Sequence, residues 1–276
     1  MSDIGGFLPP AVEIHLAIAL LLKIISEIFR KYSLTRKIMI SNNRVETTLF
    51  LIQSVDGKIS TGDVDERDQE IDFPKIKGIK EGLYQYYEFL FKTDRHALIT
   101  GTVLAKIGIN TQDEVDDHKD VNMIVIDKKP HLTKKGVNNL LTSFNKLYLV
   151  TNNKDHPVFS LENEKALETI FYSTDIDLRD LFVKLKQNYS INRISIQSGG
   201  TLNAIFLKQK LIDHISLIIA PCLVGGKTTP TSIDGKAPRT VKDLLNIKAL
   251  TLKKCEVLKY SYLHLYYDVI NETRLD

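Results

Sequence analysis

The sequence predicts a single α/β domain with a mainly parallel central sheet and an antiparallel hairpin at its C-terminal end. Short apolar runs alternate with stretches of helical character, which is typical of strands joined by crossover helices. The last two apolar runs have no helix-forming stretch between them, and this favours a hairpin. The chain has 276 residues, of which 43% are hydrophobic, enough for a substantial core, and no linker or internal repeat divides it.

The predicted sheet begins at residues 47–53, the first apolar run after the pattern changes near Asn43. Further apolar runs with polar or glycine boundaries suit strands buried on both faces, and they lie at residues 97–100, 122–126, 147–150 and 193–197. Helices are predicted at residues 82–91, 136–143, 178–189 and 202–208, the third with Asp175 or Asp177 as its N-cap. Residues 215–221, 249–258 and 263–269 complete the sheet, the last two as the hairpin.

Residues 1–44 are predicted to form a helical extension ahead of the domain at residues 45–276. Residues 11–32 favour a helix, but Glu13, Lys23 and Glu27 leave an uncharged run too short to span a bilayer. Acidic residues precede this run and basic residues follow it, which is the reverse of a secretory signal. Three interpretations stay open: a helix docked on the domain, a weak membrane-surface anchor, or an extension upstream of a natural start at Met39. No firm membrane association is expected.

The composition excludes several classes of function. The 37 Lys and Arg residues against 34 Asp and Glu residues leave a formal charge of +3, with the two signs interspersed, which argues against nucleic acid as a partner. Cys222 and Cys255 form neither a disulfide framework nor a metal-ligand cluster, and the seven histidines lack a zinc-binding pattern. We therefore expect a small-molecule partner, no metal, and a reducing cytoplasm as the compartment.

Three glycine-bearing turns at predicted strand ends are the candidate functional motifs. Residues 53–60 follow the first strand and include Asp56-Gly57. Residues 198–202 join a strand to a helix. The two glycines in this turn would let a phosphate approach the free N–H groups of the helix N-terminus. Residues 220–227 end a later strand in glycines. Each turn alone is better explained as an ordinary connection.

Taken together, the order and spacing of the motifs resemble the reductase domain of riboflavin-biosynthesis proteins. The resemblance covers about residues 46–269. The matching segments are Ser-x-Asp-Gly-Lys-Ile at residues 54–59, Gly-Thr-Val-Leu-Ala at 101–105, Gly-Gly-x-Leu at 199–202, Leu-Ile-Asp at 211–213, Ala-Pro at 220–221 and Val-Gly-Gly at 224–226. This resemblance implies a dihydrofolate-reductase-like fold, NADPH as cofactor, and a homodimer. It also implies reduction of the ribosyl group of a ribosylaminopyrimidine 5′-phosphate to ribityl.

The resemblance also implies roles for particular residues. Those implied to bind the cofactor are Ser54, Thr102, Thr151, Ser198, Gly199, Gly200, Thr201 and Leu202. Those implied to bind the substrate are Gln53, Gly225, Gly226 and Lys227. An open-chain imine would accept the hydride at C1′, and Asp56 or Lys58 would donate the proton that the ring oxygen needs. A valine at Gly200 is expected to block NADPH and to leave the fold largely intact.

Two positions depart from the family pattern. Lys106 stands where the family commonly has an acid, and Ser198 stands where many members have Glu. The charged segment at residues 62–68 is either a substrate loop or a solvated loop. Alternative functions are therefore an NADPH-dependent reductase of another heterocycle such as a pterin, or a non-catalytic nucleotide-binding relative. Deaminase activity, which often accompanies this reductase, is not expected, because its zinc-ligand motifs are missing before Glu46.

Overall fold

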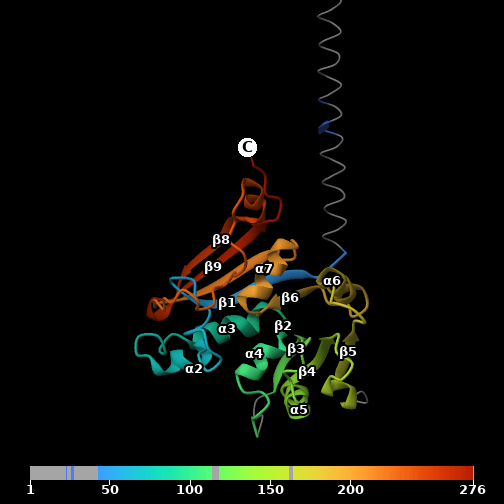
Figure 1. Ribbon diagram of the computed structural model, residues 1–276. Helices are drawn as coiled ribbons and strands as arrows, with labels where there is room; N and C mark the ends of the chain where they lie inside the picture. Colours follow the sequence, from blue (N-terminus) through green and yellow to red (C-terminus); the bar gives the residue numbers. More distant parts are fainter. Residues whose placement is uncertain (1–22, 24–25, 28–42, 114–117, 162–163, 276) are drawn as a thin grey trace, which may run out of the picture. The chain divides into compact units, whose positions relative to one another are not determined.

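The computed structural model describes residues 23, 26–27, 43–113, 118–161 and 164–275 (Figure 1). The chain divides into two compact units, Met1–Arg44 and Val45–Asp276. In the first unit Lys23, Ser26 and Glu27 are helical, and the Ser26 hydroxyl donates a hydrogen bond to the carbonyl of Lys23. The rest of the predicted N-terminal helix lies outside the described residues. Among those that are described, no helix is both long and apolar enough to cross a bilayer.

The second unit is built on one nine-stranded sheet, with strand order β5-β4-β3-β2-β6-β1-β7-β9-β8. The strands are β1 (Glu46–Ser54), β2 (His96–Thr100), β3 (Lys119–Ile126), β4 (Phe144–Thr151), β5 (Leu167–Phe171), β6 (Arg193–Ile196), β7 (His214–Ala220), β8 (Ala249–Val257) and β9 (Leu263–Ile270). All pairings from β5 to β7 are parallel, whereas β9 is antiparallel to both β7 and β8. The predicted α/β class, parallel sheet and C-terminal hairpin are confirmed.

Helices cover both faces of the sheet. They are α2 (Gln69–Asp72), α3 (Tyr84–Thr93), α4 (Gly101–Lys106), α5 (Lys134–Ser143), α6 (Leu178–Gln187) and α7 (Gly200–Lys208), with short 3-10 helices at Phe73–Lys75, Pro157–Leu161, Val241–Asn246 and Lys259–Ser261. Phe182 of α6 and Phe206 of α7 pack with Leu49 of β1 on one face. On the other face, α4 and α5 pack against β2 to β4, and α3 packs against β1 and β7. Because side chains alternate along a strand, Leu49 and Phe50 serve opposite cores.

The structure adds elements that the pattern did not predict. The strand β5 and the helices α2 and α4 are short, and short elements carry little periodicity. Asp177, not Asp175, caps α6, since its carboxylate accepts from the N–H groups of Arg179 and Asp180. Asp175 instead pairs with Lys128 at 2.9 Å. The helix predicted from residue 82 begins at Tyr84.

Candidate active site

The candidate site lies at the carboxyl ends of the parallel strands. In the strand order, β2, β6, β1 and β7 are adjacent, so the segments that follow them meet at one edge of the sheet (Figure 1). Three of these segments are the glycine-bearing turns, and the fourth is α4, which carries Thr102. Ligands of α/β sheets bind at this edge because the following loops and helix N-termini converge there.

The turn after β1 is fastened to the loop after β7. Asp56 accepts hydrogen bonds from the Ser54 hydroxyl at 2.5 Å and from the N–H groups of Val224 at 3.1 Å and Gly225 at 2.7 Å. These bonds, led by the one from Ser54, lower the pKa of Asp56 to about 2. The carboxyl is therefore ionised at neutral pH, and it acts as an acceptor.

Lys58 makes a second connection between the same two segments. Its ammonium donates to the carbonyls of Gly226 at 2.8 Å and Thr229 at 3.0 Å. The backbone N–H of Lys58 also donates to Ser54 Oγ at 3.0 Å. Both residues predicted as proton donors thus hold the loop after β7 in place.

The loop after β7 adopts conformations that require glycine. Gly225 and Gly226 have φ of +74° and +80°, a region that other residues rarely occupy. Gly225, Gly226 and Lys227 are all exposed. Gln53 at the end of β1 accepts a hydrogen bond from the Ser232 hydroxyl further along this loop. The predicted substrate residues therefore belong to the loop after β7 or bond to it.

The two glycines before α7 have different surroundings. A Cβ on Gly199 would meet open space, whereas one on Gly200 would lie 2.2 Å from the Thr231 carbonyl oxygen and 2.3 Å from the Asp234 carboxylate. The expectation that valine at Gly200 leaves the fold intact is wrong, because the protein itself fills that side. Of the two glycines, Gly199 is therefore the one with open space beside it.

The other residues of the second turn are divided between the interior and the surface. The Ser198 hydroxyl is buried and donates to the Asn203 side chain at 2.5 Å. Leu202 packs on the core, and Thr201 is exposed beside Gly199. Thr201 and the open side of Gly199 therefore remain accessible at the start of α7.

Thr102 lies in the first turn of α4, next to a cluster that sequence reasoning missed. Its hydroxyl is 3.4 Å from His131 Nε2, and His131 Nδ1 lies 2.8 Å from the Asp127 carboxylate. His156 is buried on the other side of Asp127 and donates to it from Nε2 at 3.1 Å, since its Nδ1 accepts from the Val158 N–H. The sequence did contain a signal for this cluster, because Asp127 directly follows a predicted buried strand.

The carboxyl of Asp127 is buried and ionised. Burial raises its pKa, but hydrogen bonds from His156, His131 and the backbone outweigh burial and lower the pKa below its usual value. Gly101 makes room for this carboxylate, since a Cβ there would lie 2.3 Å from the Asp127 carboxyl carbon. Thr151, at the end of β4, donates to the Asp127 carbonyl at 2.7 Å and is fully buried. Its hydroxyl thus stabilises this cluster.

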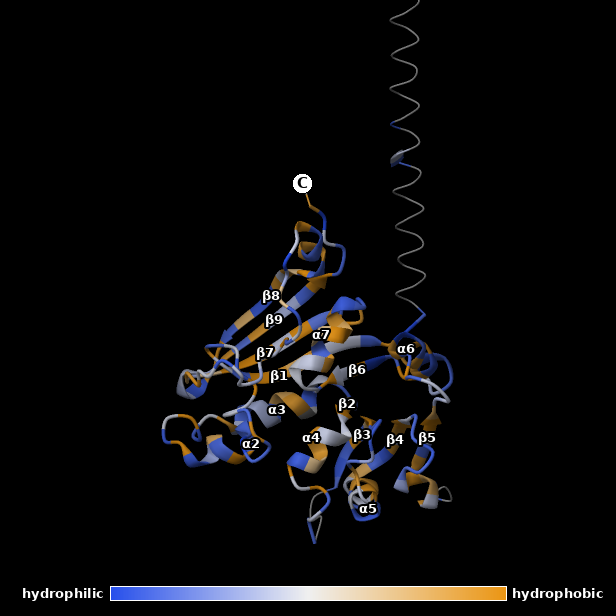
Figure 2. Ribbon diagram, in the orientation of Figure 1, coloured by the Kyte–Doolittle hydropathy of each residue, from blue (hydrophilic) through white to orange (hydrophobic). Residues whose placement is uncertain are grey.

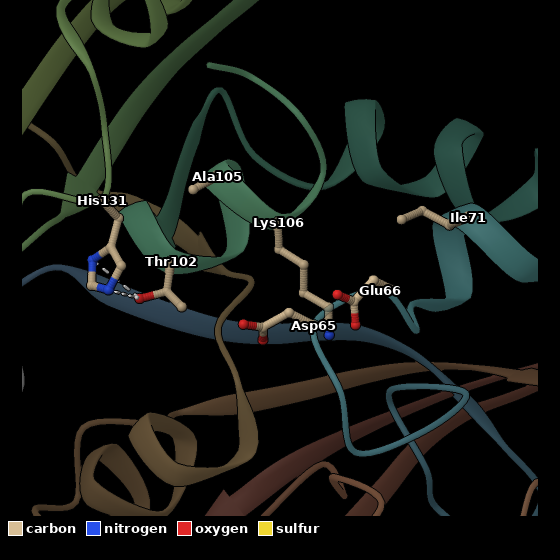
Figure 3. Close-up of a pocket in the computed structure, with 7 residues that line it drawn as sticks. All are labelled: Asp65, Glu66, Ile71, Thr102, Ala105, Lys106 and His131. Atoms are coloured by element: carbon tan, nitrogen blue, oxygen red, sulfur yellow. Dashed lines mark hydrogen bonds between the residues drawn. The ribbon is translucent and has the colours of Figure 1, made fainter. Parts of the chain in front are cut away.

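A pocket of about 560 Å³ opens beside α4 (Figure 3). It is lined by Asp65, Glu66, Ile71, Thr102, Ala105, Lys106 and His131. Lys106 extends from α4 toward the acidic segment, and its Nζ lies 3.9 Å from Asp68 Oδ2. Burial, the largest effect, raises the pKa of Asp68, and the nearby Lys106 ammonium lowers it. The charged segment at residues 62–68 is therefore part of a pocket wall.

Comparisons with known proteins agree with this arrangement. The model of the RibD C-terminal domain matches residues 46–263. A 2,5-diamino-6-ribosylamino-4(3H)-pyrimidinone 5′-phosphate reductase of Aquifex aeolicus is 29% identical over 94 residues, which is 33% of this chain and 42% of the relative. This chain therefore spans less than half of that relative's length.

Solved structures share the fold at low sequence identity. RibD of Acinetobacter baumannii has a TM-score of 0.58 at 15% identity, covering 82% of this chain and 58% of that one. A diaminohydroxyphosphoribosylaminopyrimidine deaminase/5-amino-6-(5-phosphoribosylamino)uracil reductase of Thermotoga maritima has a TM-score of 0.55 at 15% identity, covering 82% and 57%. The predicted dihydrofolate-reductase-like fold is confirmed. Since the family match extends over most of the unit built on the sheet, the chain belongs to the RibD C-terminal domain family.

Proposed function

We propose that this protein is an NADPH-dependent reductase that converts the ribosyl group of a ribosylaminopyrimidine 5′-phosphate to ribityl. The observation that carries the proposal is the meeting of the family's motifs at the ends of β1, β2, β6 and β7, beside the pocket that Thr102 and Lys106 line. Motifs distant in sequence share one edge of the sheet, as a site for two ligands requires.

The residues around α4 and α7 fit a dinucleotide. The first N–H groups of α7 have no intrahelical acceptor, and the space beside Gly199 is open, so a phosphate has access there. Beside α4, Thr102 and His131 offer the dinucleotide a hydroxyl and an imidazole. The bound cofactor supplies the hydride, and these residues bind and orient it. Thr151 supports the site through Asp127.

Asp56 and Lys58 have different roles in this proposal. Asp56, ionised and saturated with donors, holds the loop that carries Gly225 and Gly226 and so positions the substrate. The Lys58 ammonium donates hydrogen bonds to carbonyls in the same loop. It is a better source of the proton for the ring oxygen than Asp56, which is ionised. Gln53 and Lys227 complete the substrate side.

A spectrophotometric assay of nicotinamide oxidation tests the function. The purified protein is given NADPH or NADH with ribosylaminopyrimidine 5′-phosphates, or with pterins. Turnover of a ribosylaminopyrimidine with preference for NADPH supports the proposal. Turnover of pterins alone would support the alternative reductase, and binding of NADPH without turnover of any substrate would support a non-catalytic relative.

We also propose that two copies associate through the edge strand β8. Nearly the whole strand is exposed, and Leu250, Leu252 and Val257 are 41%, 52% and 79% exposed. Hydrophobic residues recur along β8 and β9 at this edge (Figure 2). A second copy would cover both the apolar side chains and the unpaired backbone groups of an edge strand. Leu252→Lys should convert a dimer to a monomer in light scattering; a wild-type monomer would refute this.

A further inference from the structure

The pocket beside α4 brings one ammonium together with carboxylates that are not bonded to it. Among the described residues that line it, Lys106 is the one lysine, while Asp65 and Glu66 contribute acids. Lys106 Nζ lies 3.9 Å from Asp68, too far for a hydrogen bond, and its side chain is 19% exposed. It makes no hydrogen bond to any described residue, so its three N–H groups are available to a ligand.

The segment that carries these carboxylates is held by contacts of its neighbouring residues. Arg67, next to Glu66, pairs with Asp72 at 3.2 Å, and its carbonyl accepts from Ser60 at 2.7 Å. Thr61 donates to the same Asp72 at 2.5 Å. Gln69 donates to the carbonyl of Lys58 at 2.6 Å, which connects the wall to the turn after β1. The backbone on either side of Asp65 and Glu66 is therefore fixed relative to the proposed substrate residues, and both carboxylates are exposed.

The charges of the pocket decide which part of the substrate fits it. A phosphate would be repelled by the two nearby carboxylates. A heterocycle whose edge presents N–H donors next to a carbonyl oxygen would instead pair its donors with the carboxylates and its oxygen with the ammonium. The pyrimidine ring suits the part of this pocket beside Asp65, Glu66 and Lys106 better than the 5′-phosphate does, while Thr102 and His131 of the same pocket stay with the cofactor.

We propose that Lys106, Asp65 and Glu66 select a 2-amino-4-oxopyrimidine over a 2,4-dioxopyrimidine. The inference rests on the proposed function and names its substrate class. In the 2-amino ring, the amino group and the neighbouring N–H both donate, and they match a carboxylate, while the 4-oxo group accepts from Lys106. In the dioxo ring an oxygen replaces the amino group, so a carboxylate would face a carbonyl without an intervening proton.

Both ring types occur in the names of similar proteins. The Aquifex aeolicus protein is named for a 2,5-diamino-4-pyrimidinone, and the Thermotoga maritima protein for an aminouracil as its reductase substrate. The two substrates differ at ring position 2 and share the 4-oxo group. They therefore separate the role of the carboxylates from that of Lys106.

The test compares kcat/KM for the two ribosylamino 5′-phosphates with saturating NADPH. The wild type should prefer the 2-amino substrate by about 10-fold or more, because a site that hydrogen-bonds a substrate's N–H groups rejects the analogue that lacks one of them. The double variant Asp65→Asn, Glu66→Gln should bring the ratio to about 1 or reverse it, since amides can donate to the 2-oxo group. Lys106→Gln should raise KM for both substrates and leave the ratio unchanged.

Glu81→Gln serves as a matched control, because Glu81 does not line the pocket and bonds the Gly78 N–H on the protein surface. Thermal midpoint and NADPH affinity are measured for every variant, so that unfolding is recognised. Equal use of both substrates by the wild type, a preference for the dioxo substrate, or a double variant with the wild-type ratio would overturn the selection and leave the reductase function supported. Failure to turn over either substrate would overturn the proposed function itself, and the selection with it.

Discussion

Alanine at Gly199 should weaken NADPH binding at little cost in stability. Gly199 has φ −70° and ψ 157°, which any residue adopts, and an added Cβ meets no atom within 4 Å. Alanine reduces the entropy of the unfolded chain, which raises the unfolding free energy by about 0.4–1 kcal/mol. Alanine is also a poorer N-cap than glycine, which lowers it by a similar amount. The net change in unfolding free energy should stay below about 1 kcal/mol. A phosphate that approaches the backbone at this position would lose its close contact, and we expect NADPH affinity to fall at least about 10-fold.

Gly200→Ala is the matched control for stability. Its Cβ would lie 2.2 Å from the Thr231 carbonyl oxygen, more than 1 Å inside ordinary contact, so backbone or Asp234 must shift. Overpacking of this kind costs about 1–3 kcal/mol. At about 2–4 °C per kcal/mol for a domain of this size, the thermal midpoint should fall by several degrees.

The assay for both variants is titration of NADPH fluorescence together with a thermal melt. The reasoning at Gly199 is refuted if Gly199→Ala binds NADPH as the wild type does. A large loss of stability in Gly199→Ala would also contradict the open space beside it. If only Gly200→Ala loses affinity, and does so while folded, the phosphate approaches from the side of Asp234 instead.

Other predictions concern the supports of the site. Asp56→Asn should lower the unfolding free energy by about 1 kcal/mol at neutral pH, after allowance for solvent exposure. The pKa of Asp56 is about 2 in the folded state, below its ordinary 3.8. The difference in unfolding free energy between wild type and variant should therefore be complete above pH 3.8 and vanish as the pH falls toward 2. Urea titrations at several pH values measure this difference, and one that does not change with pH would contradict the prediction. Gly101→Ala should lower the unfolding free energy by about 1–3 kcal/mol and weaken NADPH binding, because the added Cβ displaces the Asp127 carboxylate that holds His131. An unchanged thermal midpoint and an unchanged NADPH affinity would contradict this. Deleting residues 1–38 should leave NADPH affinity within a few-fold, as every candidate site residue follows them; a folded truncation that fails to bind would show otherwise.

The strands and long helices were predictable because their apolar residues recur at the right period. The core side chains of β1 and α6 are examples, and the errors there are of one to a few residues at the ends. The short helix α4 was visible as a motif, but six residues contain too little periodicity to mark a helix. The order of strands in the sheet, which brings β6 between β2 and β1, comes from long-range pairing and leaves no local mark.

The site was predictable in its glycine turns and not in its charged contacts. Asp56 was expected because of the motif, yet its bonds to the loop after β7 join residues 168 and 169 positions apart. The buried contact between Asp127 and His156 likewise depends on the neighbouring positions of β3 and β4. A pattern of residue types shows which groups are present, and the tertiary packing decides which of them meet.

The departure at Lys106 argues for a changed substrate preference more than for lost activity. A lysine in place of an acid on α4 alone would make the pocket basic. The structure instead places Asp68 3.9 Å from that lysine and puts Asp65 and Glu66 along the same pocket. Negative charge is thus supplied by another segment, one fixed to the turn after β1 by Gln69. The compensation is expected if the pocket still has to pair with a ring that both donates and accepts hydrogen bonds.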